Sequence, residues 1–243
     1  MLFRSKNIIL DLIQNYKKYF IKINLDKFTK PVIPKKYQTP IFLVGFPRSG
    51  TTLLDSILRS HSKILVLEEK LIISSIRDRF FEKNNNKINS LELLSDDDIL
   101  SLQSEYFDML HEIMNEDIHN KIIIDKLPLN LIEVGFIKRV FPQSKFILML
   151  RHPCDTVLSC FMSDFKINEG MASFYNLKDV KTVIACCTQY ALYNMHDPPY
   201  HTQHTVCTIY YMQCTTYDTQ HTIHHARYTQ DIYIYIYIYI YDT

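Results

Sequence analysis

Charged residues follow each of four strand-like stretches of this sequence, and they are of the types that bind and transfer an anionic group. Residues 41–44, 64–67, 121–124 and 145–150 are followed in turn by a glycine-bounded loop at 45–52, by Glu68 and Glu69, by Asp125 and Lys126, and by Arg151. Backbone amides, lysine and arginine stabilise negative charge, and a carboxylate accepts the proton of an attacking hydroxyl. The combination predicts a site that transfers an anionic group.

The loop between Gly45 and Gly50 has the spacing of a phosphate-binding loop. Glycine permits dihedrals that let amide groups converge on an anion, and the N-terminus of the following helix adds positive potential. Thr51 occupies the position where an ATP-binding loop has its lysine, and the cation of this loop is Arg48 instead. We therefore expect phosphate binding without the usual placement of a β/γ-phosphate and Mg²⁺. The alternative is a plain strand–turn–helix connection.

Helical stretches alternate with the four strand-like ones. Apolar residues at helical spacing occur at 53–58, 71–81, 95–113, 131–141 and 153–161, and Pro142 ends the fourth of these. Alternating helices and near-continuous apolar strands predict an α/β fold with a parallel central sheet that helices cover on both faces. Ligands of such sheets bind at the carboxyl ends of the strands. The four polar groups are therefore expected at one edge of the sheet.

The sequence divides into three predicted parts. Residues 1–38 form a basic helix, at 6–23, and a proline-containing linker, and residues 39–183 form the core. Residues 184–243 lack apolar periodicity, and 232–241 alternate Ile and Tyr, as a translated T/A dinucleotide repeat does. We interpret 184–243 as a low-complexity tail, non-native or disordered, from read-through or a wrong gene model. The alternative is a strand with a metal-binding tail that contains His201, His204, His221, His224 and His225.

Composition excludes some classes of protein. A net charge of +1 with 47% hydrophobic residues suits a globular protein and argues against a dedicated nucleic-acid binder. The basic residues of the N-terminal segment are interpreted as a solvated helix face, with a membrane surface or an acidic partner as the alternative. The 6 cysteines have no metal-ligand or redox spacing, so buried free thiols and no metal are expected.

Two motifs resemble those of sulfotransferases that use 3′-phosphoadenosine 5′-phosphosulfate (PAPS). FLVGFPRSGTTLL at 42–54 resembles their 5′-phosphosulfate-binding loop, and RHPCDTVLSC at 151–160 resembles their 3′-phosphate-binding segment. Residues 122–161 are most similar to the tyrosylprotein sulfotransferase-like branch, which includes bacterial enzymes with this domain behind tetratricopeptide repeats. The resemblance covers residues 40–180 and implies a P-loop NTPase-like three-layer fold, here incomplete at its C-terminus.

The resemblance also implies roles for individual residues. Glu69 matches the general base, Lys126 the catalytic lysine, and Arg48 a further charge-stabilising group. The residues that match donor-binding positions are Arg48, Ser49, Gly50, Thr51, Thr52, Arg151 and Ser159. The implied co-substrate is PAPS, and the implied acceptor is a hydroxyl, with protein tyrosine as one candidate. No metal is implied.

Departures from the family pattern keep other interpretations open. Lys70 and Leu71 replace a Thr-Arg pair that positions the acceptor in the tyrosylprotein enzymes, and the tail replaces family elements that follow Ser159. The alternatives are a non-catalytic nucleotide-binding remnant and a P-loop kinase-like phosphotransferase, against which the missing lysine argues.

No transmembrane or signal segment is evident, so a soluble cytoplasmic location is expected, with the Golgi lumen as the alternative for an incomplete N-terminus. A homodimer is an open alternative.

Overall fold

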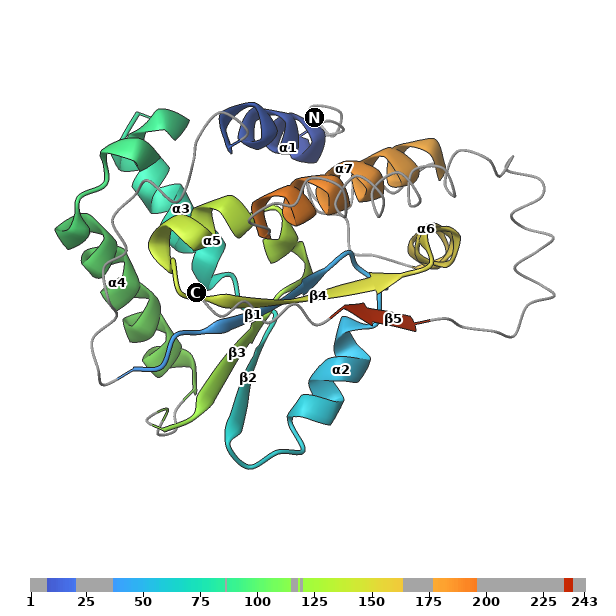
Figure 1. The fold of residues 1–243 in the computed structure, drawn as a ribbon, viewed down its shortest axis with the longest axis horizontal. Helices are drawn as coiled ribbons and strands as arrows, with labels where there is room; N and C mark the ends of the chain where they lie inside the picture. The colour runs from blue at the N-terminus through green and yellow to red at the C-terminus, as the bar shows by residue number, and fades with distance from the viewer. Residues whose placement is uncertain are drawn as a thin grey trace.

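A central sheet of parallel strands organises the protein. The computed structural model describes residues 8–20, 37–85, 87–114, 118, 120–163, 177–195 and 234–237. The strands are β1 (Ile41–Gly45), β2 (Ile64–Glu68), β3 (Ile122–Lys126) and β4 (Lys145–Arg151). They lie in the order β2-β3-β1-β4, all parallel, and β5 (Ile234–Tyr237) adds an antiparallel edge next to β4 (Figure 1). The predicted α/β fold with a parallel central sheet is confirmed.

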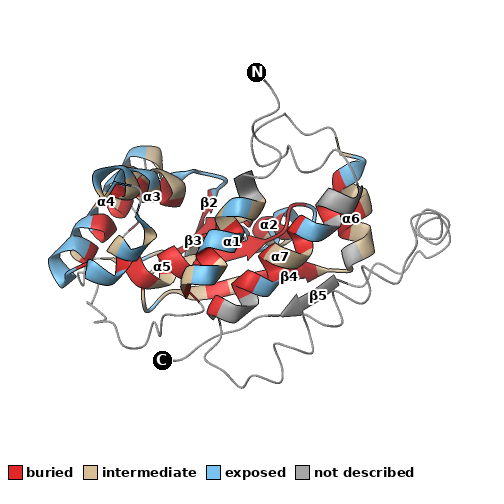
Figure 2. Cartoon of the chain, turned by 90° about the horizontal axis from the view of Figure 1, so that it is seen from above, coloured by how far each residue is buried: buried red, intermediate tan, exposed pale blue. Residues whose placement is uncertain are grey.

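Helices cover both faces of this sheet unequally. One face carries α2 (Thr51–Leu58), which follows β1 and its loop directly. On the opposite face lie α1 (Ile8–Phe20), α3 (Ile72–Lys83), α5 (Val134–Val140) and α7 (Leu177–Met195) (Figures 1 and 2). The remaining helices are η2 (Ile88–Leu93), α4 (Asp96–Met114), η3 (Pro128–Leu131) and α6 (Pro153–Phe161). None of the described helices is both long and apolar enough to cross a bilayer.

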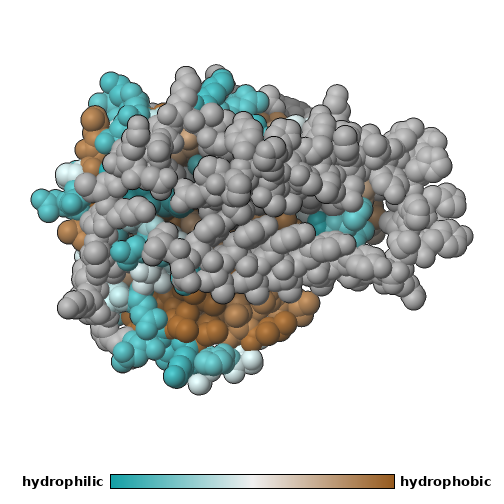
Figure 3. Space-filling view, in the orientation of Figure 1, coloured by the Kyte–Doolittle hydropathy of each residue, from teal (hydrophilic) through white to brown (hydrophobic). Residues whose placement is uncertain are grey.

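The alternation of side chains along β1 divides the core in two. Phe42 and Val44 point into the larger apolar cluster, and Leu43 points into a smaller one on the α2 face. Aromatic rings fill the larger cluster, where Phe42 stacks on Phe146 with ring centroids 5.7 Å apart. The smaller cluster is thinly covered: Figure 3 shows apolar side chains gathered over α2, where Leu53 and Ile57 are more than half exposed.

The predicted boundary at residue 184 lies inside α7. Ile184, Cys187, Tyr190 and Ala191 are buried in the larger cluster together with Val180, so the core extends past the boundary. The apolar residues recur every three or four positions, but polar and cysteine residues between them obscure the pattern. The rest of the predicted tail, including its histidines and all of the repeat except β5, lies outside the described residues.

Two other predictions need correction or lie outside the described residues. The helix predicted at 131–141 is shorter in the structure, because the 3-10 turn η3 occupies the chain up to Leu131 and α5 spans only Val134–Val140. The basic N-terminal helix is α1, and its apolar side packs on α7 and belongs to the core. The proline-containing linker at 21–36 lies outside the described residues.

Candidate functional site

The loop after β1 turns tightly into the N-terminus of α2. The Ser49 amide donates to the Phe46 carbonyl at 3.1 Å, and Arg48 and Gly50 adopt positive φ values of 70° and 103°. The Ser49 hydroxyl is buried and makes no hydrogen bond among the described residues. A buried hydroxyl without a partner is costly unless a ligand satisfies it. Together with the helix N-terminus, this arrangement fits an anion.

Gly45 allows the loop to pack this closely on the sheet. A Cβ atom at Gly45 would lie 2.7 Å from the Ser49 hydroxyl and 2.8 Å from the Met149 carbonyl oxygen on β4. Neither distance is compatible with an ordinary contact. Gly45 is therefore required because no side chain fits there, whereas Gly50 is required because its φ is positive.

Two arginines lie together on one side of this loop. Arg48 Nε donates to the Ser159 hydroxyl at 3.0 Å, and Arg151 Nη1 donates to the Arg48 carbonyl at 3.2 Å. The buried Cys160 thiol donates to the Pro47 carbonyl at 3.3 Å and so joins α6 to the loop. Asp155 lies 3.9 Å from Arg151 Nε, which makes no hydrogen bond among the described residues. Arg48, Arg151 and Ser159, which are predicted to bind PAPS, thus form one cluster. Within it, the Nε–H group of Arg151 remains available for a hydrogen bond.

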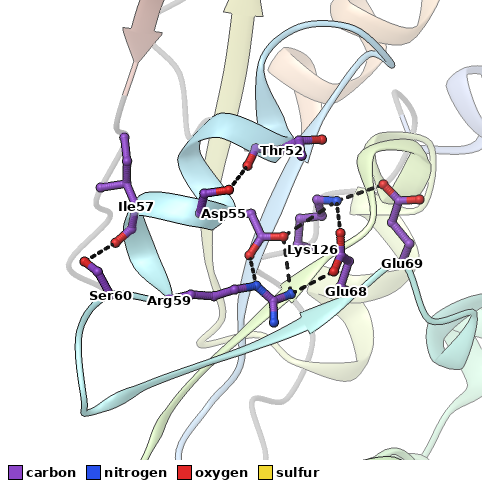
Figure 4. A network of polar contacts seen from close by, with 9 residues as sticks. Thr52, Asp55, Ile57, Arg59, Ser60, Glu68, Glu69 and Lys126 are labelled. Atoms are coloured by element: carbon purple, nitrogen blue, oxygen red, sulfur yellow. Dashed lines mark hydrogen bonds and ion pairs between the residues drawn. The ribbon is translucent and has the colours of Figure 1, made fainter.

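Lys126 lies on the other side of the loop, at the end of β3, and is completely buried. Its ammonium group is 2.8 Å from Glu69 Oε1, 3.5 Å from Glu68 Oε1 and 3.8 Å from Asp55 Oδ2 (Figure 4). A buried ammonium group is tolerated only with carboxylates close by, because burial removes its hydration.

Contacts distinguish the two adjacent glutamates. Glu68 Oε1 faces Lys126 and Oε2 pairs with Arg59 Nη2 at 3.2 Å, so both oxygens are engaged. Glu69 pairs with Lys126 through Oε1, and its other oxygen points away from the lysine (Figure 4). The two side chains are similarly exposed, 53% for Glu68 and 55% for Glu69, so the contacts of their second oxygens are what separates them. Of the two, Glu69 has the oxygen that an incoming group can reach.

The structure also identifies residues that sequence patterns missed. Asp55 is buried on α2 and accepts from Arg59 Nε at 2.5 Å. Thr51, Asp55 and Arg59 are spaced four positions apart, which places them on one side of the helix, and this spacing was the available signal.

A second buried carboxyl lies next to Lys126 on the opposite face of β3. Asp125 is fully buried, and it accepts from the Tyr106 hydroxyl at 3.1 Å and from Asn130 Nδ2 at 3.5 Å. Burial raises the pKa of Asp125 to about 7, and the hydrogen bond from Tyr106 opposes the rise. Asp125 thus belongs to the core, and Lys126 belongs to the site.

The predicted site residues come from the carboxyl ends of all four parallel strands. They form two groups, one around Arg48, Ser159 and Arg151 and one around Glu69 and Lys126, with the loop and α2 between them. Within the described part of the chain, no set of three or more His, Cys, Asp or Glu residues is arranged to hold a metal ion.

Comparison with known proteins supports one family. The family model described as the sulfotransferase family matches residues 40–224, which is more than half of the chain. The chain belongs to the sulfotransferase family. The match includes both groups of site residues, and it continues across α7.

Known relatives are moderately similar to this chain in sequence. An uncharacterized protein of Aquifex aeolicus (strain VF5) is 28% identical over 169 residues, which cover 65% of this chain and 22% of that protein. Human protein-tyrosine sulfotransferase 1 is 30% identical over 135 residues, which cover 54% of this chain and 36% of that protein. The chain therefore spans well under half the length of these relatives.

One solved structure is also similar. The sulfotransferase domain from the curacin biosynthetic pathway aligns with a TM-score of 0.42 and 17% sequence identity. The alignment covers 75% of this chain and 80% of that domain.

Proposed function

We propose that this sulfotransferase-family protein transfers a sulfuryl group from PAPS to a hydroxyl acceptor, with Glu69 as the general base. The proposal depends chiefly on the Glu69–Lys126 pair, in which the buried ammonium group lies 2.8 Å from a carboxylate that is half exposed. One oxygen of Glu69 is oriented by Lys126, and the other is available to a proton. This is the geometry that a general base requires.

The loop after β1 and the segment formed by the end of β4 and α6 hold the donor. The amides of residues 49–52 and the hydroxyls of Ser49, Thr51 and Thr52 bind the 5′-phosphosulfate at the N-terminus of α2. Arg151 and Ser159 bind the 3′-phosphate. The unpartnered Ser49 hydroxyl and the unused Nε of Arg151 support these roles. Both are buried hydrogen-bond donors, and the 5′-phosphosulfate and the 3′-phosphate of the nucleotide would accept from them.

In the transfer step the acceptor oxygen attacks sulfur while the bond between sulfur and the 5′-phosphate oxygen breaks. The acceptor proton passes to Glu69, and the electron pair of the broken bond leaves with 3′-phosphoadenosine 5′-phosphate (PAP). Negative charge on the sulfuryl and leaving oxygens is stabilised by Lys126, Arg48 and the loop amides. As in phosphoryl transfer, positioning and electrostatics supply the catalysis.

The proposed acceptor is a protein tyrosine, because several relatives are named protein-tyrosine sulfotransferases. Lys70 and Leu71 are exposed directly after Glu69, and Leu71 is 63% exposed. We propose that this pair contacts the acceptor next to the reacting hydroxyl. An apolar side chain and a cation there favour a substrate with a ring and a neighbouring acidic residue.

The adjacent glutamates provide the test of the proposal. We expect Glu69→Gln to lower the rate of transfer of labelled sulfuryl groups by about 100-fold or more, because the base is lost. Glu68→Gln should lower it clearly less than Glu69→Gln does, because Glu68 supplies part of the charge that compensates Lys126 but accepts no proton. In both variants PAP should still raise the melting temperature, because neither residue binds the donor.

Other outcomes would favour the alternatives. A protein that PAP stabilises but that transfers nothing to any hydroxyl would be the non-catalytic remnant. Stabilisation by ATP with Mg²⁺, and none by PAP, would support the kinase-like reading. An equal loss in the Glu68 and Glu69 variants would contradict the assignment of the base.

A further inference from the structure

We infer that Asp55, on the helix that begins at the donor-binding loop, is a positioning residue for Lys126. The inference rests on the proposed function. No motif or comparison assigns a role to Asp55. It is found only from its contacts in the folded protein (Figure 4).

Asp55 is one of four charged groups that form a closed ring. Its Oδ1 pairs with Arg59 Nε at 2.5 Å, and its Oδ2 lies 3.8 Å from Lys126 Nζ. Glu68 completes the ring, at 3.2 Å from Arg59 and 3.5 Å from Lys126. Two cations thus alternate with two carboxylates, and the ring is neutral overall. Glu69 lies outside it, and its carboxylate pairs with Lys126.

Because the ring is neutral, Glu69 remains available to accept a proton. Lys126 has no exposed surface, so carboxylates must compensate its charge. Asp55 and Glu68 supply part of that compensation, and Glu69 need not supply it all. Without the Asp55 charge, Lys126 would depend more strongly on Glu69. A tighter Glu69–Lys126 pair restrains the Glu69 carboxylate and changes the position of the ammonium group.

Helix α2 connects this ring to the donor. Thr51 and Asp55 are the two buried residues of α2, and four positions separate them, so they lie on one face of the helix. Thr51 is in the first turn, where the anion binds. Arg59 caps the same helix, and its amide donates to the Asp55 carbonyl at 2.9 Å. Asp55 therefore holds Lys126 at a fixed place relative to the helix whose first turn meets the donor.

The test compares Asp55→Asn with Asp55→Glu and with the wild type. For Asp55→Asn we expect kcat to fall about 10- to 100-fold, as displaced catalytic groups typically cause, while KM for PAPS changes less than about 3-fold. PAP should still raise the melting temperature of Asp55→Asn as it does for the wild type. Asp55→Glu should recover most of the kcat, because the gap of 3.8 Å to Lys126 leaves room for a longer carboxylate.

Glu105→Gln is the matched control. Glu105 pairs with Arg79 across α3 and α4, and this carboxylate–arginine pair belongs to neither group of site residues. The variant should keep the wild-type kcat. If Asp55→Asn also keeps the wild-type kcat, or if it loses kcat and the PAP-induced stabilisation together, Asp55 does not position Lys126.

A second measurement is independent of turnover. NMR order parameters of the Lys126 ammonium nitrogen, whose signal is identified by its absence in Lys126→Arg, report how rigidly the group is held. We expect the order parameter to fall in Asp55→Asn and to be unchanged in Glu105→Gln. Should the wild type transfer no sulfuryl group, the proposed function fails, and this measurement still decides the role of Asp55. An unchanged order parameter would overturn it.

Discussion

Glu69 and Arg48 adopt backbone conformations that are unusual for residues with a side chain. Their φ values are 50° and 70°, in the left-handed region that glycine enters without cost. Such strain is typically retained where surrounding contacts hold a functional group in place. For Glu69 those contacts are the hydrogen bond from its amide to the Lys126 carbonyl, at 2.7 Å, and the ion pair with Lys126.

The strain at Glu69 predicts an inverted order of stability. Glu69→Gly and Glu69→Ala both lose the carboxylate, but we expect the glycine variant to be more stable by about 1 kcal/mol, because alanine keeps the strained backbone. Urea denaturation of both variants measures the difference. At Ser56, an exposed position within α2, the order should be the usual one, with alanine more stable than glycine by about 1 kcal/mol. Equal stabilities of the Glu69 variants would show that the position is unstrained.

Asp125 predicts a pH dependence of stability. Its pKa in the folded protein is about 7, above that of an unfolded aspartate, so the folded state binds more protons between about pH 4 and pH 7. The contribution of Asp125 to the free energy of unfolding should therefore fall as the pH rises through this range. Asp125→Asn removes this loss and retains an oxygen to accept from Tyr106.

We expect Asp125→Asn to gain stability relative to the wild type by on the order of 1 kcal/mol per pH unit across that range. Chemical denaturation of both proteins at several pH values provides the measurement. A difference that stays constant from pH 4 to pH 8 would contradict an elevated pKa at Asp125.

Local patterns were enough to predict some site residues and not others. The pairs Glu68/Glu69 and Asp125/Lys126 were predicted because each follows an apolar strand, and the resemblance then selected Glu69 and Lys126 within them. Asp55 was not predicted, because its partner Lys126 is distant in the chain and only the folded sheet brings them together. Likewise, Glu69 rather than Glu68 has an unengaged oxygen because Arg59 pairs with Glu68, and this contact too is seen only in the folded protein.

Among the elements, the loop between β1 and α2 has two glycines that are required for different reasons. At Gly45 a Cβ would collide with Ser49 and Met149, whereas at Gly50 the nearest atom, Met149 Cε, would be 3.5 Å away, so the constraint is the φ of 103°. The same substitution should therefore have different effects at the two positions.

We expect Gly45→Ala to displace Ser49 and to abolish most of the stabilisation by PAP. Gly50→Ala should cost about 1–2 kcal/mol of folding stability through backbone strain and keep part of the PAP effect. Melting temperatures with and without PAP separate the two effects. If Gly45→Ala responds to PAP as the wild type does, close packing at Gly45 is not needed for donor binding.

Most elements were predictable because periodicity is local. All four parallel strands and α1, α2, α3, α4 and α6 lie where apolar spacing placed them. The helix predicted at 131–141 was too long, because η3 ends before Glu133, whose buried carboxylate accepts from Tyr16 on α1 and from Arg77 on α3. That contact joins distant segments, and no local pattern contains it.

At the scale of the whole molecule, α7 completes the core from a segment where the sequence predicted a tail. Tyr190 is 1% exposed, and its ring lies 6.1 Å from that of Tyr16 and 6.3 Å from that of Phe20 on α1. Gly135 on α5 permits this packing, because a Cβ there would lie 2.6 Å from Phe20 and 2.7 Å from the Tyr190 hydroxyl. Three separate parts of the chain therefore meet at one point.

This packing predicts the shortest chain that folds. A protein ending at residue 183 should lack a cooperative unfolding transition, because losing each large buried side chain costs about 2–5 kcal/mol. A protein ending at residue 195 should unfold cooperatively and respond to PAP, since we propose that the core ends with α7. Thermal unfolding of both, with a chain ending at 224 as the control where the family match ends, provides the measurement. Cooperative unfolding of the chain ending at 183 would restore the boundary at 184.

The contact between α1 and α7 also affects how the protein is made. A ribosome releases α1 first, and its apolar side, including Tyr16 and Phe20, remains uncovered until α7 has been synthesised. During that interval the nascent chain exposes the surface that chaperones bind. Production of this chain should therefore improve when chaperones are supplied.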